Sequence, residues 1–221
     1  YFLTETQKDM ARIHEIDPAL LDGMWNQFDA KGVARKGLTV DLSGNFPSVV
    51  KAPEPPPFSQ RSRRADYGKE DLNNGFSLDL WVELNSLKAD QWLVDIRTAD
   101  GRGYALRTTG DRGVEIILSD GRTESRWASD PGALVAGRPQ HIVAIVDGGP
   151  EVITFVIDGK LNDGGDARQF GWGRFNPNMK TAAGAPEMRI GQNLDGKVLS
   201  LRLYSRYLRT SEAIAAFRAG L

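Results

Sequence analysis

Hydrophobic residues follow two different periods along the chain. Between Thr4 and Phe28 the apolar positions recur at intervals of three and four residues, which predicts helix. From Phe76 onward, short runs alternate apolar and polar residues, as in strands that bury one face. We therefore expect a helical lead-in over residues 1–36 and an all-β domain over residues 37–221.

The β region contains a series of runs that predict strands. They cover residues 76–84, 92–98, 104–109, 114–119, 141–147, 152–158 and 198–204. Asp-Gly pairs between them favour tight hairpins, because both residues tolerate positive φ. Short strands at this spacing, with no long helices between them, predict a two-sheet antiparallel sandwich of the jelly-roll type. Residues 210–220 predict a short C-terminal helix with Thr210 or Ser211 as its N-cap.

The N-terminal segment carries the signals of two short helices. Thr4 and Gln7 have the spacing of a capping box, and Asp17 followed by Pro18 is typical of a second helix start. These helices either lie against the sandwich or belong to a neighbouring domain. Residues 51–57 are rich in proline, which excludes a central strand and predicts a rigid surface connection.

Composition excludes several classes of function. The formal net charge is −1, with 28 basic and 29 acidic residues, which argues against a nucleic-acid partner. Cysteine is absent, so disulfides, thiolate catalysis and cysteine-based zinc sites are excluded. No apolar run approaches the roughly 18 residues that a membrane-spanning helix needs. The first residues lack the pattern of a signal peptide, and we expect a mature or excised fragment.

Four stretches of the β region resemble one known family. They read F-S-L-D-L-W-V from residue 76, H-I-V-A-I-V-D-G from residue 141, F-V-I-D-G-K from residue 155 and V-L-S-L-R-L-Y-S-R-Y-L from residue 198. In this order they resemble the laminin-G-like, concanavalin-A-like lectin/glucanase superfamily, in its bacterial jelly-roll version. The resemblance implies a sandwich with one concave face. It also implies a carbohydrate-binding module of a larger secreted bacterial protein, located outside the cell or in the periplasm.

Calcium is the one cofactor that the resemblance suggests. The loop Asp41-Leu42-Ser43-Gly44-Asn45 resembles the family's D-x-S-G-N loop, which supplies oxygen ligands. The family's Asp-Glu pair on the closing strand is replaced here by Leu199 and Ser200. Because calcium needs several oxygen ligands, usually including carboxylates, this change leaves calcium possible but not established.

Strand parity selects the candidate ligand-binding residues. In the strand 76–84 the apolar positions share one face, while Asp79 and Trp81 share the other. An aromatic ring among polar groups is typical of a sugar-binding face. The same alternation selects Asp95 and Arg97, and Arg107 is added from the neighbouring strand. Trp127 is added because it lies in a loop-like region, where recognition residues usually vary. The predicted ligand-binding residues are Asp79, Trp81, Asp95, Arg97, Arg107 and Trp127. The alternative is that Trp81 packs under a covering segment and the face is structural.

Three functions remain open at this point. A glycan-binding module requires exposed aromatic and arginine side chains that converge. A structural or protein-interaction domain requires that the same face be covered and Trp81 buried. A polysaccharide lyase or glycoside hydrolase is weaker, because the lyase-like stretches 122–126 and 140–142 place His141 one position early, on the opposite face, and no E-x-D-x-x-E strand occurs. The sequence therefore favours a non-catalytic glycan partner or a neighbouring domain.

Overall fold

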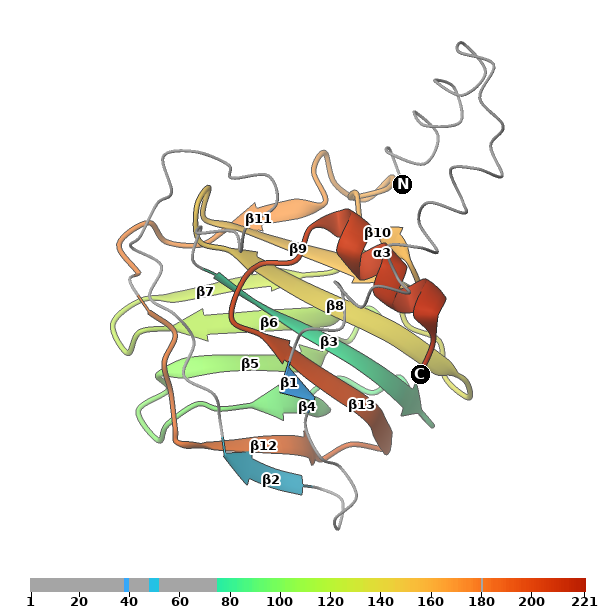
Figure 1. The fold of residues 1–221 in the computed structure, drawn as a ribbon, viewed down its shortest axis with the longest axis horizontal. Coiled ribbons are helices and arrows are strands. Elements are labelled where there is room, and N and C mark those ends of the chain that lie inside the picture. Colours follow the sequence, from blue (N-terminus) through green and yellow to red (C-terminus); the bar gives the residue numbers. More distant parts are fainter. Residues whose placement is uncertain (1–37, 40–47, 52–74, 180) are drawn as a thin grey trace.

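The computed structural model describes residues 38–39, 48–51, 75–179 and 181–221. These residues form two antiparallel sheets and one short helix, which confirms the predicted mostly-β sandwich (Figure 1). The expected N-terminal helices, the proline-rich connection and the loop Asp41–Asn45 lie outside the described residues, as does the expected boundary at residues 36 and 37. None of the described helices is long and apolar enough to cross a membrane.

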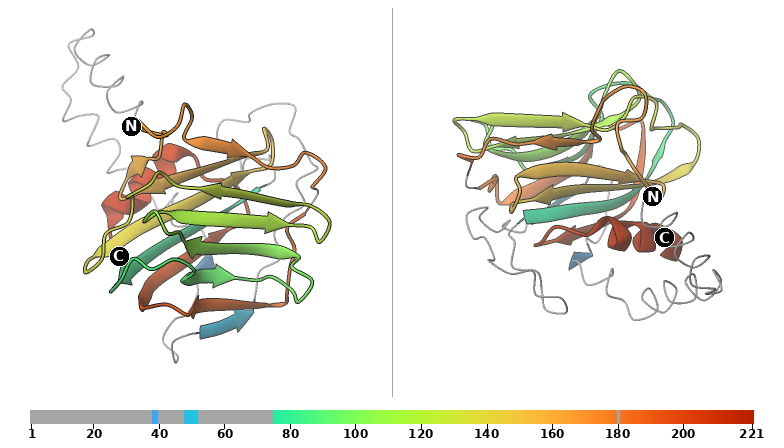
Figure 2. Two further views of the ribbon diagram at one scale, coloured as in Figure 1. Left: turned by 180° about the vertical axis from the view of Figure 1, so that it is seen from behind. Right: turned by 90° about the horizontal axis from the view of Figure 1, so that it is seen from above.

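Two sheets make the layers of the sandwich. Sheet A has the order β1 (Leu38–Thr39), β13 (Gly196–Tyr204), β3 (Gly75–Leu84), β8 (Pro139–Asp147), β9 (Val152–Ile157) and β10 (Lys160–Leu161), and β11 (Trp172–Arg174) also pairs with β9. Sheet B has the order β2 (Ser48–Lys51), β12 (Glu187–Gln192), β4 (Trp92–Asp95), β5 (Gly103–Thr108), β6 (Val114–Ser119) and β7 (Glu124–Ala128). The two layers are seen edge-on in Figure 2.

The main hydrophobic core lies between the sheets. In β3 the residues Leu78, Leu80 and Val82 point into it and are fully or almost fully buried, as the parity of this strand predicts. Phe76 and Tyr104 join the two layers with ring centroids 4.6 Å apart. Burial raises the pKa of the Tyr104 hydroxyl far above its ordinary value.

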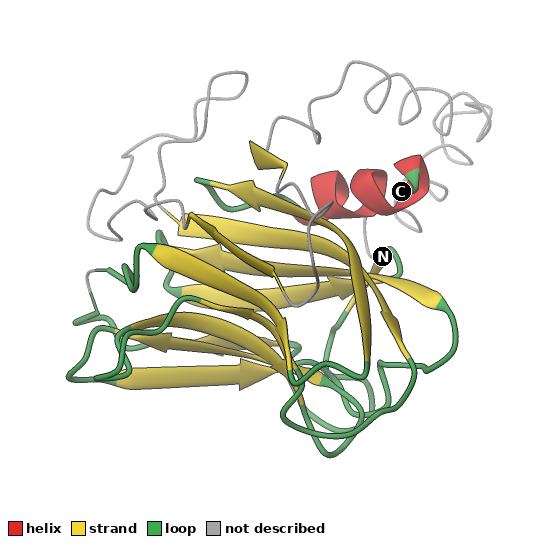
Figure 3. Ribbon diagram, turned by 90° about the horizontal axis from the view of Figure 1, so that it is seen from below, coloured by secondary structure: helices red, strands yellow, loops and turns green. Residues whose placement is uncertain are grey.

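The helix α3 (Thr210–Ala219) lies across the outer face of sheet A (Figure 3). Its underside completes a second apolar cluster with residues from β8, β9 and β13; the buried members are Val143, Ile145, Val156, Tyr204, Leu208 and Ala213. The N-cap is Arg209, so the predicted capping by Thr210 or Ser211 is wrong. Instead, Glu212 accepts a hydrogen bond from the backbone N–H of Arg209 at 2.9 Å and a two-pronged contact from Arg206.

Several strands of the sandwich were not predicted. β7, β10, β11 and β12 are short or carry charged residues at alternate positions, as in the Glu-Met-Arg-Ile-Gly-Gln sequence of β12. Pairing with a neighbouring strand makes them regular, and local hydrophobicity alone does not reveal such strands.

Candidate functional site

Asp79 and Trp81 lie on the outer face of sheet A, beneath α3. The Asp79 carboxylate Oδ1 is 2.9 Å from Nε2 of His141, and both side chains are completely buried. The Trp81 ring contacts His141 and Phe217 at centroid distances of 5.0 and 5.8 Å, and the rings of His141 and Phe217 lie 5.9 Å from each other. Trp81 is only 8% exposed. In this arrangement α3 occupies the place that a ligand would need.

This covered face is polar as well as aromatic. Within the described part of the chain, Oδ2 of Asp79, Nε1 of Trp81, Nδ1 of His141 and Oγ of Ser200 are buried without a hydrogen-bond partner. Unpaired buried polar atoms reduce stability. The packing of α3 must therefore offset their cost, and His141 cannot reach a substrate at the surface while α3 is in place.

Trp92 lies on the outer face of sheet B, as Trp81 does on sheet A. A β-bulge in β4 shifts the register, so that Trp92 pairs with Arg107 while Val94 pairs with Leu106. Leu93 and Val94 both enter the core as a result. The bulge thereby turns Trp92 to the outer face, where the side chain is partly exposed.

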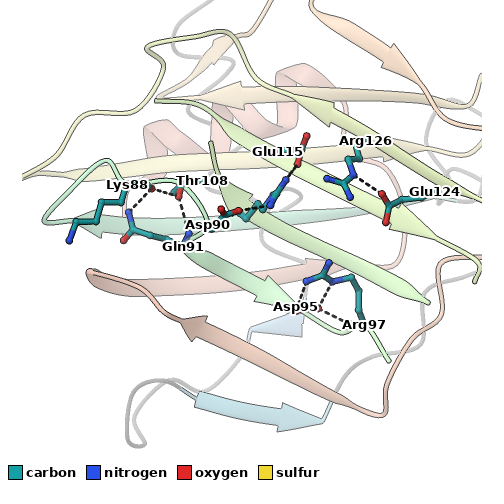
Figure 4. Close-up of polar contacts among 10 residues, drawn as sticks. Lys88, Asp90, Gln91, Asp95, Arg97, Thr108, Glu115, Glu124 and Arg126 are labelled. Carbon is teal, nitrogen blue, oxygen red and sulfur yellow. Dashed lines mark hydrogen bonds and ion pairs between the residues drawn. The ribbon is translucent and has the colours of Figure 1, made fainter. Parts of the chain in front are cut away.

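A carboxylate network holds Arg97 over the ring of Trp92, and Figure 4 shows the contacts between Arg97 and Asp95. Arg97 donates from Nε and Nη2 to the two oxygens of Asp95, at 3.0 and 2.9 Å, and its backbone N–H donates at 2.8 Å. Nη2 of Arg189 lies 3.2 Å from the same carboxylate. Burial would raise the pKa of Asp95, but the hydrogen bonds and charges of Arg97 and Arg189 together lower it below its ordinary value.

Arg107 approaches Trp92 from the neighbouring strand β5. It donates from Nε and Nη2 to Glu115 Oε2, at 3.0 and 2.7 Å, and from Nη1 to Asp90. The guanidinium carbons of Arg97 and Arg107 lie 4.2 and 5.3 Å from the centroid of the Trp92 ring. Both distances are within the range of cation–π attraction.

The loop before Trp92 is held by Gln91. This buried amide donates to the carbonyls of Ser86 and Lys88 and accepts from the backbone N–H of Asp195 at 2.7 Å. Thr108 links the same loop to β5, since its hydroxyl donates to the Lys88 carbonyl at 2.6 Å (Figure 4). Trp92 therefore projects from a fixed backbone.

Trp127 has a different environment from the other candidates. Its ring packs against the main core and directly against Gly173 of β11, where a side chain of any size would overlap the ring. The guanidinium carbon of Arg168 lies over the ring, 4.5 Å from its centroid, and Nη2 of Arg168 donates to Asp130 at 2.7 Å. Trp127 serves as an anchor for the segment that leads to β11.

The predicted site residues therefore do not share one face. Asp95, Arg97 and Arg107 come together on the outer face of sheet B, whereas Asp79 and Trp81 are buried under α3. Strict alternation along 92–98 places Trp92 on the core face, so parity missed it. The signal available in the sequence is the unbroken apolar run Trp92-Leu93-Val94, which interrupts the alternation where the bulge occurs.

The described residues contain no cluster of metal-binding side chains. No group of three acidic or histidine side chains among them is arranged to hold a metal ion. Ser200, which stands at one position of the family's acidic pair, has a buried hydroxyl that is unpaired in this part of the chain.

A sequence profile described as the concanavalin A-like lectin/glucanases superfamily, laminin G type, matches residues 62–215. The chain belongs to this superfamily. The match spans all strands from β3 to β13 and most of α3, in agreement with the sequence resemblance. No curated protein matches this chain by sequence.

Solved structures with the same fold include domains that bind sugars. A carbohydrate-binding module of family 40 from the Ruminococcus gnavus IT-sialidase, bound to α2,3-sialyllactose, has a TM-score of 0.51 and 14% identity, over 76% of this chain and 95% of that one. The ligand-binding domain of botulinum neurotoxin serotype D, in complex with N-acetylneuraminic acid, has a TM-score of 0.50 and 11% identity, over 66% of this chain. The matched part spans only 37% of that neurotoxin chain. At these identities the similarity shows a shared fold.

Proposed function

We propose that this chain is a non-catalytic carbohydrate-binding module, and that the outer face of sheet B around Trp92 holds the glycan. The observation that carries the proposal is Trp92 itself, a partly exposed ring with the guanidinium groups of Arg97 and Arg107 over it. Sugar rings pack their C–H faces on aromatic rings, and fixed polar groups around the ring orient the hydroxyls. The known ligands of two proteins with this fold agree with a sugar partner.

The charges around Trp92 favour a neutral sugar. Each described arginine of this face has a carboxylate partner on the same face; the pairs are Arg97 with Asp95, Arg107 with Glu115 and Asp90, Arg126 with Glu124, and Arg189 with Asp95. Because the positive charge is locally compensated, it would attract an acidic sugar only weakly. Hydroxyl groups both donate and accept hydrogen bonds, which suits such a mixed surface.

The setting of the module is a further part of the proposal. We propose that the module is one part of a larger secreted bacterial protein, working outside the cell or in the periplasm. A structural role has support on the other side of the sandwich, where α3 covers Trp81. We assign that face to stability and the face of sheet B to binding.

The test follows the indole N–H signal of Trp92 by nuclear magnetic resonance. The signal is assigned by its loss in Trp92→Ala. The protein is titrated with cellohexaose, xylohexaose, mannohexaose and laminarihexaose, each with calcium and with a chelator. We expect a saturable shift with at least one sugar, and an affinity about tenfold lower, or about 1.4 kcal/mol, in Arg107→Ala.

Val135→Ala is the matched control, because Val135 is an exposed apolar residue in the loop between β7 and β8. Its affinity should equal that of the unmodified protein. A Trp92 signal that stays still with every sugar rejects this face as the binding site.

A further inference from the structure

Two aromatic side chains are exposed side by side at the edge of the sandwich. Phe170 is 50% exposed and Trp172 is 39% exposed, and their ring centroids are 5.1 Å apart. Trp172 is the first residue of β11, which pairs with β9 near the edge of sheet A (Figure 1). Neither ring takes part in the face around Trp92.

The loop that carries this pair is firmly built. Asn162 accepts a hydrogen bond from the Asp130 backbone N–H at 2.9 Å, and Asp130 in turn accepts from the Gly164 backbone N–H and from Arg168. Gly171 packs so closely on Asn162 that no side chain would fit there. The rings are thus presented by a fixed backbone, which lowers the entropy cost of binding.

Strand register sets the direction of Trp172. Gly173 pairs with Ile153 and points inward to the ring of Trp127, so Trp172, which pairs with Thr154, points outward from sheet A. Arg174 lies two residues on, on the same side as Trp172, and is exposed. The two rings therefore have a hydroxyl and a guanidinium group beside them, and they lie on the opposite side of the sandwich from Trp92.

The size of the patch favours a sugar over a protein partner. The other large apolar side chains that are exposed in the described part of the chain are Val49, Val135 and Leu221, and they belong to β2, a loop after β7 and the C-terminal residue. A stable protein interface buries about 800 Å² on each partner around an apolar centre. Two adjacent rings in polar surroundings offer much less apolar area than that, but enough for one sugar ring.

We propose that Phe170 and Trp172 form a second saccharide-binding site, in which a sugar ring stacks on the pair and Thr154 and Arg174 contact its hydroxyls. This inference rests on the proposed function for its ligand class, but not for its residues. Two sites on opposite faces allow one module to engage two glycan segments, so binding to a long polymer exceeds that of either site alone.

The experiment records the indole signals of Trp172 and Trp92 in the same titrations with the four hexasaccharides and with α2,3-sialyllactose. Trp172→Ala assigns the first signal. We expect the Trp172 signal to shift saturably, to keep its affinity in Trp92→Ala, and to lose about tenfold in Phe170→Ala. Val135→Ala again serves as the control for an exposed apolar residue.

Each outcome separates the two proposals. If only the Trp92 signal shifts, the second site is rejected and the proposed function stands. If only the Trp172 signal shifts, the second site is supported and the face around Trp92 is rejected. If the Trp172 shift disappears in Trp92→Ala, no independent site exists, and if neither signal moves, both sites are rejected.

Discussion

Each outer face of the sandwich carries a tryptophan and an aspartate beside a basic side chain. On sheet A the three are Trp81, Asp79 and His141, and all of them lie beneath α3. On sheet B the basic residue is Arg97, beside Trp92 and Asp95, and no described helix covers the face (Figure 2). The same residue types thus give a structural layer on one side and an open surface on the other.

The basic residue explains much of this difference. Arginine keeps its charge, and complete burial of an arginine–carboxylate pair carries a large desolvation cost. A face with Arg97, Arg107 and Arg126 therefore resists a covering helix. The side chains of Arg97, Arg107 and Arg126 are 23%, 22% and 48% exposed.

The largest expected effect contrasts the two tryptophans. Trp81→Ala removes a buried ring that packs against both His141 and Phe217, and it should lower the free energy of unfolding by about 3–5 kcal/mol. Trp92→Ala should lower it by less than about 1 kcal/mol, because the ring is partly exposed. Urea unfolding of both variants measures the contrast.

A control variant shows whether packing against α3 causes the larger loss of stability in Trp81→Ala. Phe217→Ala removes the helix residue that stacks on Trp81 at 5.8 Å, and it should also be clearly destabilising. Equal losses for Trp81→Ala and Trp92→Ala would contradict the division of the two faces into structural and open.

Strand parity could predict which residues of one strand share a face, but not what covers that face. In β3 the alternation from Phe76 to Leu84 holds, so Asp79 and Trp81 were correctly separated from the core. Their burial depends on α3, which lies more than a hundred residues further along the chain. No local pattern connects Phe217 with Trp81.

Parity failed at β4 for a different physical reason. The bulge between Trp92 and Val94 adds one residue to the strand and reverses the side of Trp92. Asp95 and Arg97 come after the bulge and keep their relative positions, so they were found while their aromatic neighbour was missed. The overall sandwich was predictable because the long strands β3, β8 and β13 carry clear alternation and turn signals.

The second prediction concerns the buried contact on sheet A. Asp79→Leu keeps the branched shape of the side chain but leaves Nε2 of His141 buried without a hydrogen-bond partner, which should cost about 1–3 kcal/mol of unfolding free energy. The double variant Asp79→Leu with His141→Leu removes both polar groups and should lose less than the sum of the single changes. Denaturant unfolding of the four proteins in the cycle measures this coupling. Strict additivity would mean that the 2.9 Å contact contributes nothing.

The third prediction concerns the partly buried carboxylate on sheet B. The folded protein lowers the pKa of Asp95 below its unfolded value of about 3.9. Asp95 therefore stabilises the fold above that pH, and its contribution is lost as the pH falls through the lower, folded-state pKa. Asp95→Asn should cost about 1–2 kcal/mol at pH 7 and progressively less in acid. Unfolding curves of both proteins between pH 7 and acid conditions check this, and a difference that stays constant with pH would contradict it.

The smallest expected effect belongs to a second ion pair on the same face. Arg126 donates to Glu124 at 2.6 Å, and the two side chains are 48% and 41% exposed. Solvent screening reduces the value of such a pair, so Arg126→Ala should change the unfolding free energy by no more than about 0.5 kcal/mol. Unfolding at low and high salt measures the effect and its screening. Because Arg126 and Arg97 share the outer face of sheet B, a loss as large as that of Asp95→Asn would show that the whole face is enclosed, and the contrast with sheet A would then fail.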